Sequence, residues 1–246
     1  MVSAAALLFA ATVFAQAPAK PGPKAVGPPD LSGIWMPEGG MSGGIAGHRF
    51  SAQEPPLQPW ALQKYQANRT GINDPGSGGL ESMDPSTYCF PTGAPRSMLM
   101  PYSFEIVQRL SLTYMLFEIG HGIRRIYTDG RKHPDDLTPA WMGHSIGRWE
   151  KDAFVADTVG LREETWLDRA GTPHSEELHM VERFRLIKPD TLEIEFLFED
   201  PKAFTKPWGG KKIYQRQHEE MSDFDLCEEH LRMGQLPGIE PNRQAQ

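Results

Sequence analysis

Hydrophobic and polar residues alternate along most of residues 104–218. Successive side chains of a β-strand point to opposite faces of a sheet, so this alternation predicts strands that each bury one face. Turn-forming Gly, Asp and Pro residues separate the alternating runs. The predicted strands cover residues 104–109, 111–119, 123–128, 144–150, 153–160, 176–187, 191–199 and 211–219.

Short loops join most of these predicted strands, which favours antiparallel pairing between neighbours. Antiparallel strands with one apolar face each can bury that face by closing into a barrel or by stacking as two sheets. We therefore predict an all-β (mainly β) fold, namely an antiparallel up-and-down barrel or half-barrel of calycin type. A β-sandwich is the alternative.

The first hundred residues have a different pattern. Residues 31–35 predict one more strand, and residues 36–100 are rich in Gly and Pro, so they should form a long N-terminal wrap. A short helix is expected at residues 59–68, because Pro59 suits the first turn of a helix.

An apolar run of mainly small residues begins the chain and leads into two small-residue cleavage sites, Val-Phe-Ala ending at Ala15 and Ala-Gln-Ala ending at Ala17. The run is too short to span a membrane and is typical of a secretory signal peptide. We expect cleavage after Ala15, with Ala17 as the alternative, and a periplasmic or secreted protein with no membrane span after cleavage. The expected divisions are a signal peptide (1–15, or 1–17), a linker (16–30), a single β domain (31–230) and a loose polar tail (231–246).

Two cysteines, Cys89 and Cys227, suit one disulfide in an oxidising compartment, and two separate thiols are the alternative. The formal net charge of the 246 residues is −7, and no basic patch stands out. This charge argues against a nucleic-acid partner, since nucleic acids are bound by clustered Lys and Arg. The expected partner is a small-molecule ligand.

One predicted strand places a carboxylate on an apolar face. Within residues 178–186, Glu182 is in phase with Leu, Met and Phe side chains, so it should be buried. In another strand Glu118 shares a face with Tyr114 and two leucines. Two carboxylates inside one barrel raise the pKa of one of them, which suits general acid–base chemistry. The alternative is a structural ion pair of these carboxylates with Arg125 or Arg148.

The charged loop of residues 131–136 follows a predicted hairpin and is expected at the mouth of the barrel, where ligands commonly bind. There His133 could shuttle a proton and Arg131 could hold an anionic group. A solvated loop with a local salt bridge is the alternative. The candidate catalytic residues are Glu182, Glu118 and His133, and the candidate binding residues are Arg131, Arg125, Arg148, Tyr114 and His144.

Two sets of side chains have the chemistry of metal ligands, but neither has a strong ligand spacing. They are His133, Asp135, Asp136 and His144, and His174, Glu177 and His179. We therefore expect no metal and no cofactor.

Several longer phrases of the chain are distinctive. They are DLSGIW (30–35), CFPTGAPR (89–96), DGRKHP (129–134), WMGHSIGRWE (141–150), TWLDRAGTPHS (165–175), ERF (182–184) and DPKAFTKPW (200–208). Through these phrases nearly the whole mature chain resembles a large family of exported proteins from soil and aquatic bacteria. One departure is Lys151-Asp152, where that family usually has Gly-Asp at a hairpin. The resemblance implies export and a single β domain, and it carries over no catalytic residue.

These observations favour an exported β-barrel protein that binds a small, partly apolar molecule and performs metal-free acid–base chemistry of lyase or isomerase type. A non-catalytic small-molecule carrier and an extracellular interaction module without a pocket are the alternatives. An unpaired Glu182 in an open barrel would favour the enzyme, and a paired Glu182 in a filled barrel would favour the interaction module.

Overall fold

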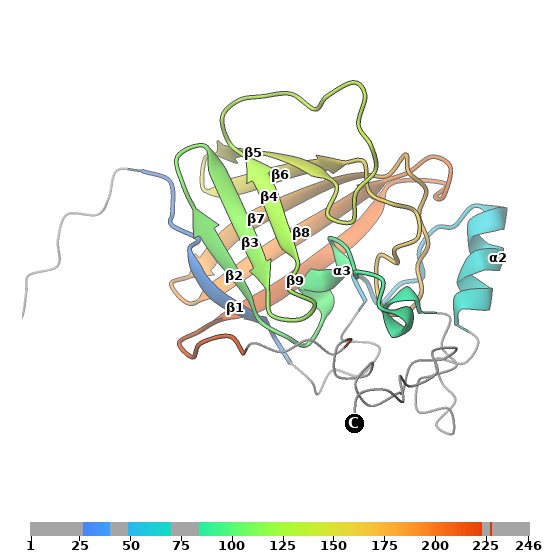
Figure 1. The fold of residues 1–246 in the computed structure, drawn as a ribbon, viewed down its shortest axis with the longest axis horizontal. Helices are drawn as coiled ribbons and strands as arrows, with labels where there is room; N and C mark the ends of the chain where they lie inside the picture. The colour runs from blue at the N-terminus through green and yellow to red at the C-terminus, as the bar shows by residue number, and fades with distance from the viewer. Residues whose placement is uncertain (1–26, 40–48, 70–83, 223–226, 228–246) are drawn as a thin grey trace, which may run out of the picture.

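The computed structural model describes residues 27–39, 49–69, 84–222 and 227. Within them, nine strands close into one barrel and follow one another round the ring in sequence order (Figure 1). Strand β1 pairs with β9 and so completes the ring. The strands are β1 (Gly33–Pro37), β2 (Phe104–Gln108), β3 (Leu112–Phe117), β4 (Ile123–Tyr127), β5 (His144–Glu150), β6 (Ala153–Val159), β7 (His179–Lys188), β8 (Thr191–Glu199) and β9 (Trp208–Gln217).

The closed barrel confirms the predicted all-β fold and excludes the sandwich. Each predicted strand is present, and only its ends differ. One pairing departs from the expected antiparallel scheme, because β4 and β5 run parallel through the partners Ile126↔Ser145 and Tyr127↔Ile146. The other described pairs round the ring are antiparallel. That the barrel is of calycin type stays a prediction.

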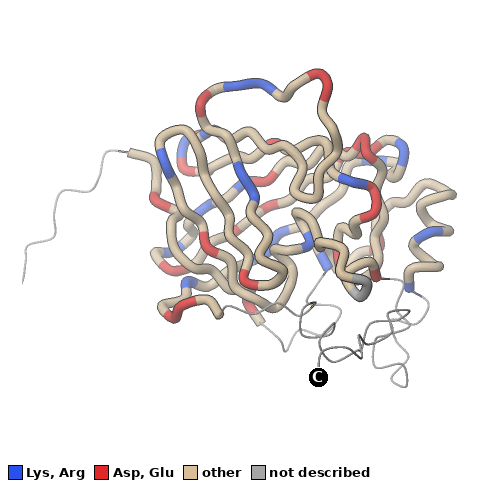
Figure 2. The backbone as a smooth tube through the Cα atoms, in the orientation of Figure 1, with Lys and Arg blue, Asp and Glu red and all other residues tan. Residues whose placement is uncertain are grey.

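The loop of residues 128–143 joins the two parallel strands and arches above β5 in Figure 1. Figure 2 shows charged positions of both signs along this loop. The next connection, between β5 and β6, is a tight turn through Lys151 and Asp152. Lys151 has a φ of 57°, a left-handed conformation that Gly adopts more readily than Lys.

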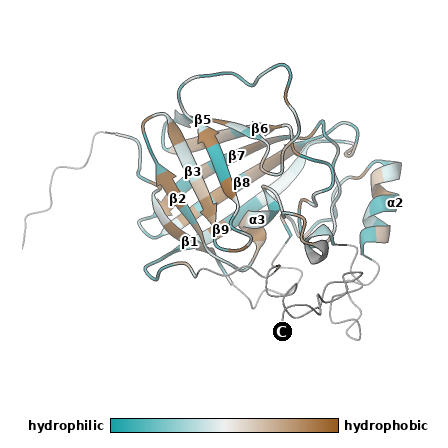
Figure 3. Ribbon diagram, viewed as in Figure 1, coloured by the Kyte–Doolittle hydropathy of each residue, from teal (hydrophilic) through white to brown (hydrophobic). Residues whose placement is uncertain are grey.

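Large apolar side chains point into the barrel from every side. Figure 3 shows that much of the most hydrophobic sequence lies in the strands. Burying these side chains supplies the main driving force for folding, about 25 cal/mol for each Å² of apolar surface. Buried members of this core include Trp35, Phe104, Met115, Phe154, Met180, Phe184, Phe196 and Tyr214.

The described residues of the N-terminal wrap include three short helices: α2 (Pro59–Asn68), the 3-10 helix η2 (Pro85–Tyr88) and α3 (Arg96–Leu99). Helix α2 begins at Pro59, as predicted. Two hydrogen bonds connect helix α2 to loops of the barrel. Trp60 Nε1 donates to the Lys202 carbonyl (2.6 Å), and Asn68 Nδ2 donates to the Gly171 carbonyl (2.8 Å). Among the described residues, none of these helices has the length and apolar character needed to cross a membrane.

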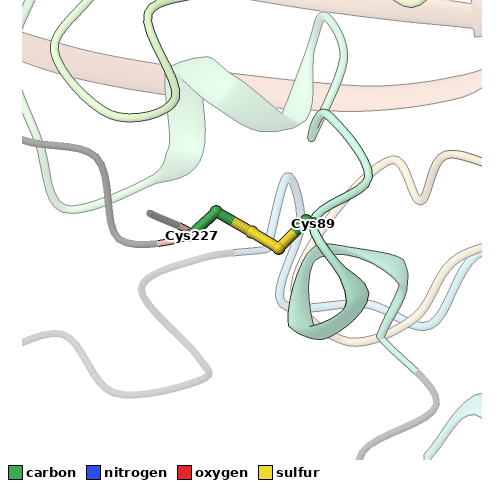
Figure 4. The surroundings of a disulfide bond; sticks show 2 residues. All are labelled: Cys89 and Cys227. Atoms are coloured by element: carbon green, nitrogen blue, oxygen red, sulfur yellow. A yellow bond between two sulfur atoms is a disulfide. The ribbon is translucent and has the colours of Figure 1, made fainter. Parts of the chain in front are cut away.

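Cys89 follows η2 and is bonded to Cys227, with the two Cα atoms 5.5 Å apart (Figure 4). The predicted disulfide is therefore confirmed. The expected signal peptide, the linker up to residue 26 and the expected loose tail lie outside the described residues.

Candidate functional site

Glu182 lies wholly buried inside the barrel on β7, as predicted. Its cationic partner is Arg124 of β4, whose Nη1 donates to Oε1 of Glu182 at 2.8 Å and whose Nη2 donates to Oε2. The expected partners were wrong. Arg125 is exposed on the other face of β4, and Arg148 is exposed on β5, where it pairs with Glu150. Adjacent residues of a strand face opposite ways, so only one of the two arginines of β4 can point inward.

Every N–H group of the Arg124 guanidinium has a partner. Nε donates to the hydroxyl of Ser145 at 3.2 Å, and Nη2 donates to the hydroxyl of Thr158 at 2.8 Å as well as to the carboxylate. The second proton of Nη1 faces two thioether sulfurs at 3.7 and 3.8 Å, those of Met98 and Met115. A buried ion pair with all its donors engaged is a structural element, because each group is needed to satisfy the others. The buried carboxylate is therefore not a free base.

Glu118 does not lie in the interior. The buried side chains of β3 are those of its odd positions, so Tyr114 and the leucines beside it face outward, and Glu118 follows the strand outside the barrel. Its carboxylate accepts hydrogen bonds from the backbone N–H of Ser103 (2.8 Å) and from the N–H and hydroxyl of Ser222 (2.9 and 2.7 Å). Partial burial raises the pKa of Glu118, but these hydrogen bonds hold it below its usual range. The expected pair of interior carboxylates was wrong.

A second polar group lies on the outer face of the barrel, where four neighbouring strands and the loop of residues 128–143 meet. We call it the histidine row. Its strand members alternate with inward-facing residues, so strand periodicity places them all on the outside. The row consists of His133 from the loop, His144 of β5, Asp157 of β6, His179 of β7 and Glu199 of β8.

The histidine row is one unbroken chain of polar contacts. Nδ1 of His133 lies 2.8 Å from Nδ1 of His144, and Nε2 of His133 lies 3.2 Å from Oδ1 of Asp157. The same carboxylate oxygen lies 2.9 Å from Nε2 of His179. Nδ1 of His179 lies 3.1 Å from Oε2 of Glu199. Protons can therefore be shared along the row from β5 to β8.

The environment of the row shifts the pKa values of Asp157, His179 and His144 in different directions. Hydrogen bonding to His179 lowers the pKa of Asp157, and the same contact raises the pKa of His179. Burial lowers the pKa of His144, and the nearby charges of His133 and Arg131 lower it further. At neutral pH Asp157 is thus ionised and His144 is neutral.

These protonation states fix which nitrogen atoms carry protons. An ionised carboxylate only accepts, so Nε2–H of His133 and Nε2–H of His179 both donate to Asp157. The 2.8 Å contact between the two Nδ1 atoms needs one donor and one acceptor, and it is satisfied when Nδ1–H of His144 donates to a lone pair on Nδ1 of His133. Nε2 of His144 is left with a lone pair, and no hydrogen bond within the described part of the chain engages this atom. The row therefore ends in an available base.

An aromatic ring and a cation flank this basic end. The ring of Tyr127 on β4 stacks on the imidazole of His144, with centroids 5.3 Å apart and an angle of 24° between the planes. The guanidinium of Arg131 lies 3.8 Å from the centroid of the same ring. Arg131 is also bound by Asp129, which accepts from its Nε and Nη2. Three predicted site residues, Arg131, His133 and His144, are thus brought together, but on the outer face of the barrel.

Sequence reasoning missed Asp157, whose signal is a single carboxylate within the apolar strand β6. It also missed the direct contact between His133 and His144, although it placed both in one candidate metal set. The second set is not assembled, since His174 is buried with its Nε2 2.7 Å from the hydroxyl of Thr165. Among the described residues, no group of three or more His, Cys, Asp or Glu side chains is arranged to hold a metal ion.

Comparison with known proteins assigns no family to this barrel. Searches against family models, curated proteins and solved structures find no match for the chain. The function is therefore inferred from the geometry of the histidine row.

Proposed function

We propose that this protein is an exported β-barrel that binds a small, partly apolar molecule at the histidine row and performs acid–base chemistry of lyase or isomerase type there. The observation that carries the proposal is the 2.8 Å contact between the Nδ1 atoms of His133 and His144, with Asp157 behind His133. The disulfide, the signal-like start of the chain and the resemblance to exported bacterial proteins support export.

In this proposal Nε2 of His144 removes a proton from the bound molecule. Positive charge then develops on the imidazole, and its Nδ1–H bond to His133 becomes stronger. His133 links His144 to the carboxylate of Asp157 through hydrogen bonds. The negative charge of that half-buried carboxylate stabilises the positive charge that develops on the imidazoles. Returning the proton to a different atom of the ligand gives an isomerase, and giving it to a leaving group gives a lyase.

The outer face supports this chemistry better than the interior does. Inside, Glu182 is paired with Arg124 and the inward positions hold large packed side chains, which is the arrangement expected of an interaction module and argues against chemistry in the interior. Outside, the side chains of His133 and Asp157 are 21% and 24% exposed, which combines access for a small molecule with partial removal from water. Partial burial strengthens the electrostatic interactions on which proton transfer depends.

The proposal is tested by the protonation of the imidazoles. Nitrogen-resolved NMR at neutral pH should find His144 with a proton on Nδ1 and none on Nε2. Asp157→Asn removes the negative charge that fixes the tautomer of His133, and should shift the signals of both histidines. A proton on Nε2 of His144 in the unaltered, ligand-free protein would overturn the proposal.

A second measurement tests the chemistry itself. The protein is incubated in heavy water with small ketones and carboxylic acids, and exchange of their acidic C–H protons is followed by NMR. Exchange should be lost in His144→Gln. It should persist in His218→Gln, because His218 is an exposed histidine outside the row.

A further inference from the structure

Arg131 offers one edge of its guanidinium to a ligand. Asp129 engages the side edge, because Nε lies 2.9 and 3.0 Å from its two carboxylate oxygens and Nη2 lies 2.6 Å from one of them. The end edge, formed by Nη1 and the second proton of Nη2, has no partner within the described residues. The side chain of Arg131 is 45% exposed, so this edge can be reached from solvent.

The position of Arg131 is restricted before any ligand binds. Asp129 holds the guanidinium from one side, and the ring of Tyr127 lies against its face. A cation held in this way loses less conformational entropy on binding than a freely moving arginine. Tyr127 also stacks on His144, so one ring positions both the cation and the base.

Opposite charges lie at the two ends of this outer surface. At one end, beside Tyr127, Arg131 presents the N–H groups of its end edge while Asp129 engages its side edge, and at the other end lie the carboxylates of Asp157 and Glu199, with His179 between them. A ligand with a single negative charge at one end fits this polarity, whereas a second negative charge would face the two carboxylates. Between the two ends, Ile146 is the register partner of both Tyr127 and Asp157 and supplies apolar surface.

We propose that the histidine row acts on a small organic monoanion, whose carboxylate binds the end edge of Arg131 while its apolar body lies over Ile146. This substrate class rests on the proposed function of the row. A carboxylate accepts two parallel N–H bonds from a guanidinium edge, which fixes both its distance and its orientation. When His144 takes a proton from carbon, the C–H bond breaks, its electron pair stays on the ligand, and the proton ends on Nε2. The guanidinium stabilises the negative charge that develops on the ligand.

The test uses benzoate as a binding probe that cannot react, with benzamide as its neutral counterpart. Benzoate should bind and should raise the pKa of His144 measured by NMR, because it brings negative charge close to the imidazole. Benzamide should bind at least about tenfold more weakly, since it lacks the charge-assisted pair with Arg131. Arg131→Gln should weaken benzoate binding by about tenfold or more, because the positive charge is lost. Arg131→Lys should weaken it by less, because Lys keeps the charge but cannot donate two parallel N–H bonds to the carboxylate.

Arg162 provides a matched control. It pairs with Glu164 two residues away at 2.5 Å, its guanidinium lies 4.5 Å from the centroid of the Trp141 ring, and its side chain is 40% exposed. Arg162, like Arg131, is paired with a carboxylate two residues away and lies against an aromatic ring, but among the described residues it makes no contact with the histidine row. Arg162→Gln should bind benzoate as the unaltered protein does.

The outcomes separate this inference from the proposed function. If benzoate does not bind, if benzamide binds equally well, or if Arg131→Gln leaves binding unchanged, the assignment of an anionic substrate is overturned. That result leaves the proposed function standing when the ligand-free protein has Nε2 of His144 unprotonated. A protonated Nε2 removes the proposed function itself, whatever benzoate does.

Discussion

Arg124 and Glu182 are ionisable residues that the barrel removes completely from water. Transfer of two such groups into a protein interior is costly, and close pairing with additional hydrogen bonds is needed to offset the cost. The hydroxyls of Ser145 and Thr158 supply those additional bonds, and they also lie 2.9 Å from each other. The pair and its two hydroxyls therefore form one mutually dependent group.

Glu182→Gln should destabilise the protein strongly. The substitution leaves the charge of Arg124 buried without a counter-charge, and we expect the free energy of unfolding to fall by about 3 kcal/mol or more. Urea denaturation measures the change. Replacing both residues, by Glu182→Leu with Arg124→Met, removes both charges and should cost less than the single substitution. A single variant as stable as the unaltered protein would contradict the structural role.

His179 should stabilise the fold only where it is charged. Its pKa is raised mainly by the hydrogen bond to Asp157, so the folded protein holds this proton more tightly than the unfolded chain. The stabilisation is fully present below the ordinary His pKa of 6.5 and is lost as the pH rises through the higher value of the folded state. At low pH the stabilisation also requires Asp157 to stay ionised. The hydrogen bond from His179 holds the pKa of Asp157 below its ordinary value of 3.8, so Asp157 is ionised above about pH 4.

His179→Gln should therefore reduce stability most between about pH 4 and pH 6.5, the window set by those two ordinary values. The loss should shrink above this window. Thermal denaturation at a series of pH values measures the loss, with His218→Gln as the control substitution at an exposed histidine outside the row. If the loss of stability instead grew as the pH rises, the pKa of His179 would not be raised in the folded protein.

At the element scale, the alternation of residue types located the strands, but it decided the inner face only where one face is clearly polar. On β7 the outward positions are mostly polar, so the burial of Glu182 followed directly. On β3 both faces are apolar, and the predicted inner face was wrong by one residue, which misplaced Glu118. On β4 two arginines are adjacent, and the sequence alone does not show that Arg124 and not Arg125 points inward.

The histidine row could be predicted only in part, for a different reason. His133 and His144 were candidates because of their chemistry, but their contact depends on the path of a long loop across the strands. Loop paths follow from tertiary packing and have no periodic signal in the sequence. Asp157 became recognisable as a partner only once that path was known.

Gly143, which ends this loop, should be needed for the position of His144. Its φ is 61°, and a Cβ atom there would lie 2.8 Å from the backbone oxygen of Val159. Gly143→Ala should lower stability by about 1–3 kcal/mol through strain and displacement, and should shift the NMR signals of His144. Gly130→Ala is the control in the same loop, because φ is 82° but nothing lies within 4 Å of the added atom. It should cost only about 1–2 kcal/mol of backbone strain and leave His144 in place.

At the scale of the whole molecule, the disulfide joins the N-terminal wrap to the segment that follows the last strand (Figure 4). It connects residues separated by 138 positions, and a cross-link over so long a loop removes much conformational freedom from the unfolded chain. The covalent link therefore acts on the whole barrel and not on one hairpin.

Replacing both Cys89 and Cys227 by Ser should lower the free energy of unfolding by about 2–5 kcal/mol. Chemical denaturation of the variant and of the unaltered protein measures this difference. Thiol titration of the unaltered protein, denatured without reductant, should detect no free thiol. Two titratable thiols would contradict the bond.

Counting strand directions round the ring explains why the loop of residues 128–143 is long. Directions can alternate throughout a closed ring only if the number of strands is even, and this ring has nine. At least one pair of neighbours must then run the same way, and among the described strands β4 and β5 are that pair. An odd ring can place its parallel pair between the first and last strands, which need no connection, or between two consecutive strands. Here β1 and β9 are antiparallel and the parallel pair is β4 and β5, so a long return segment must join them, because parallel neighbours cannot be joined by a tight hairpin.

In this protein the return segment carries Arg131 and His133. Shortening it to a hairpin would reverse β5 and the strands after it relative to β4, and the nine-strand ring could then close only with β1 and β9 running parallel. The connection that holds the loop side of the histidine row is thus required by the antiparallel closure of β1 on β9 in a ring of nine strands. The same stretch of chain therefore makes the present closure of the ring possible and carries two residues of the proposed site.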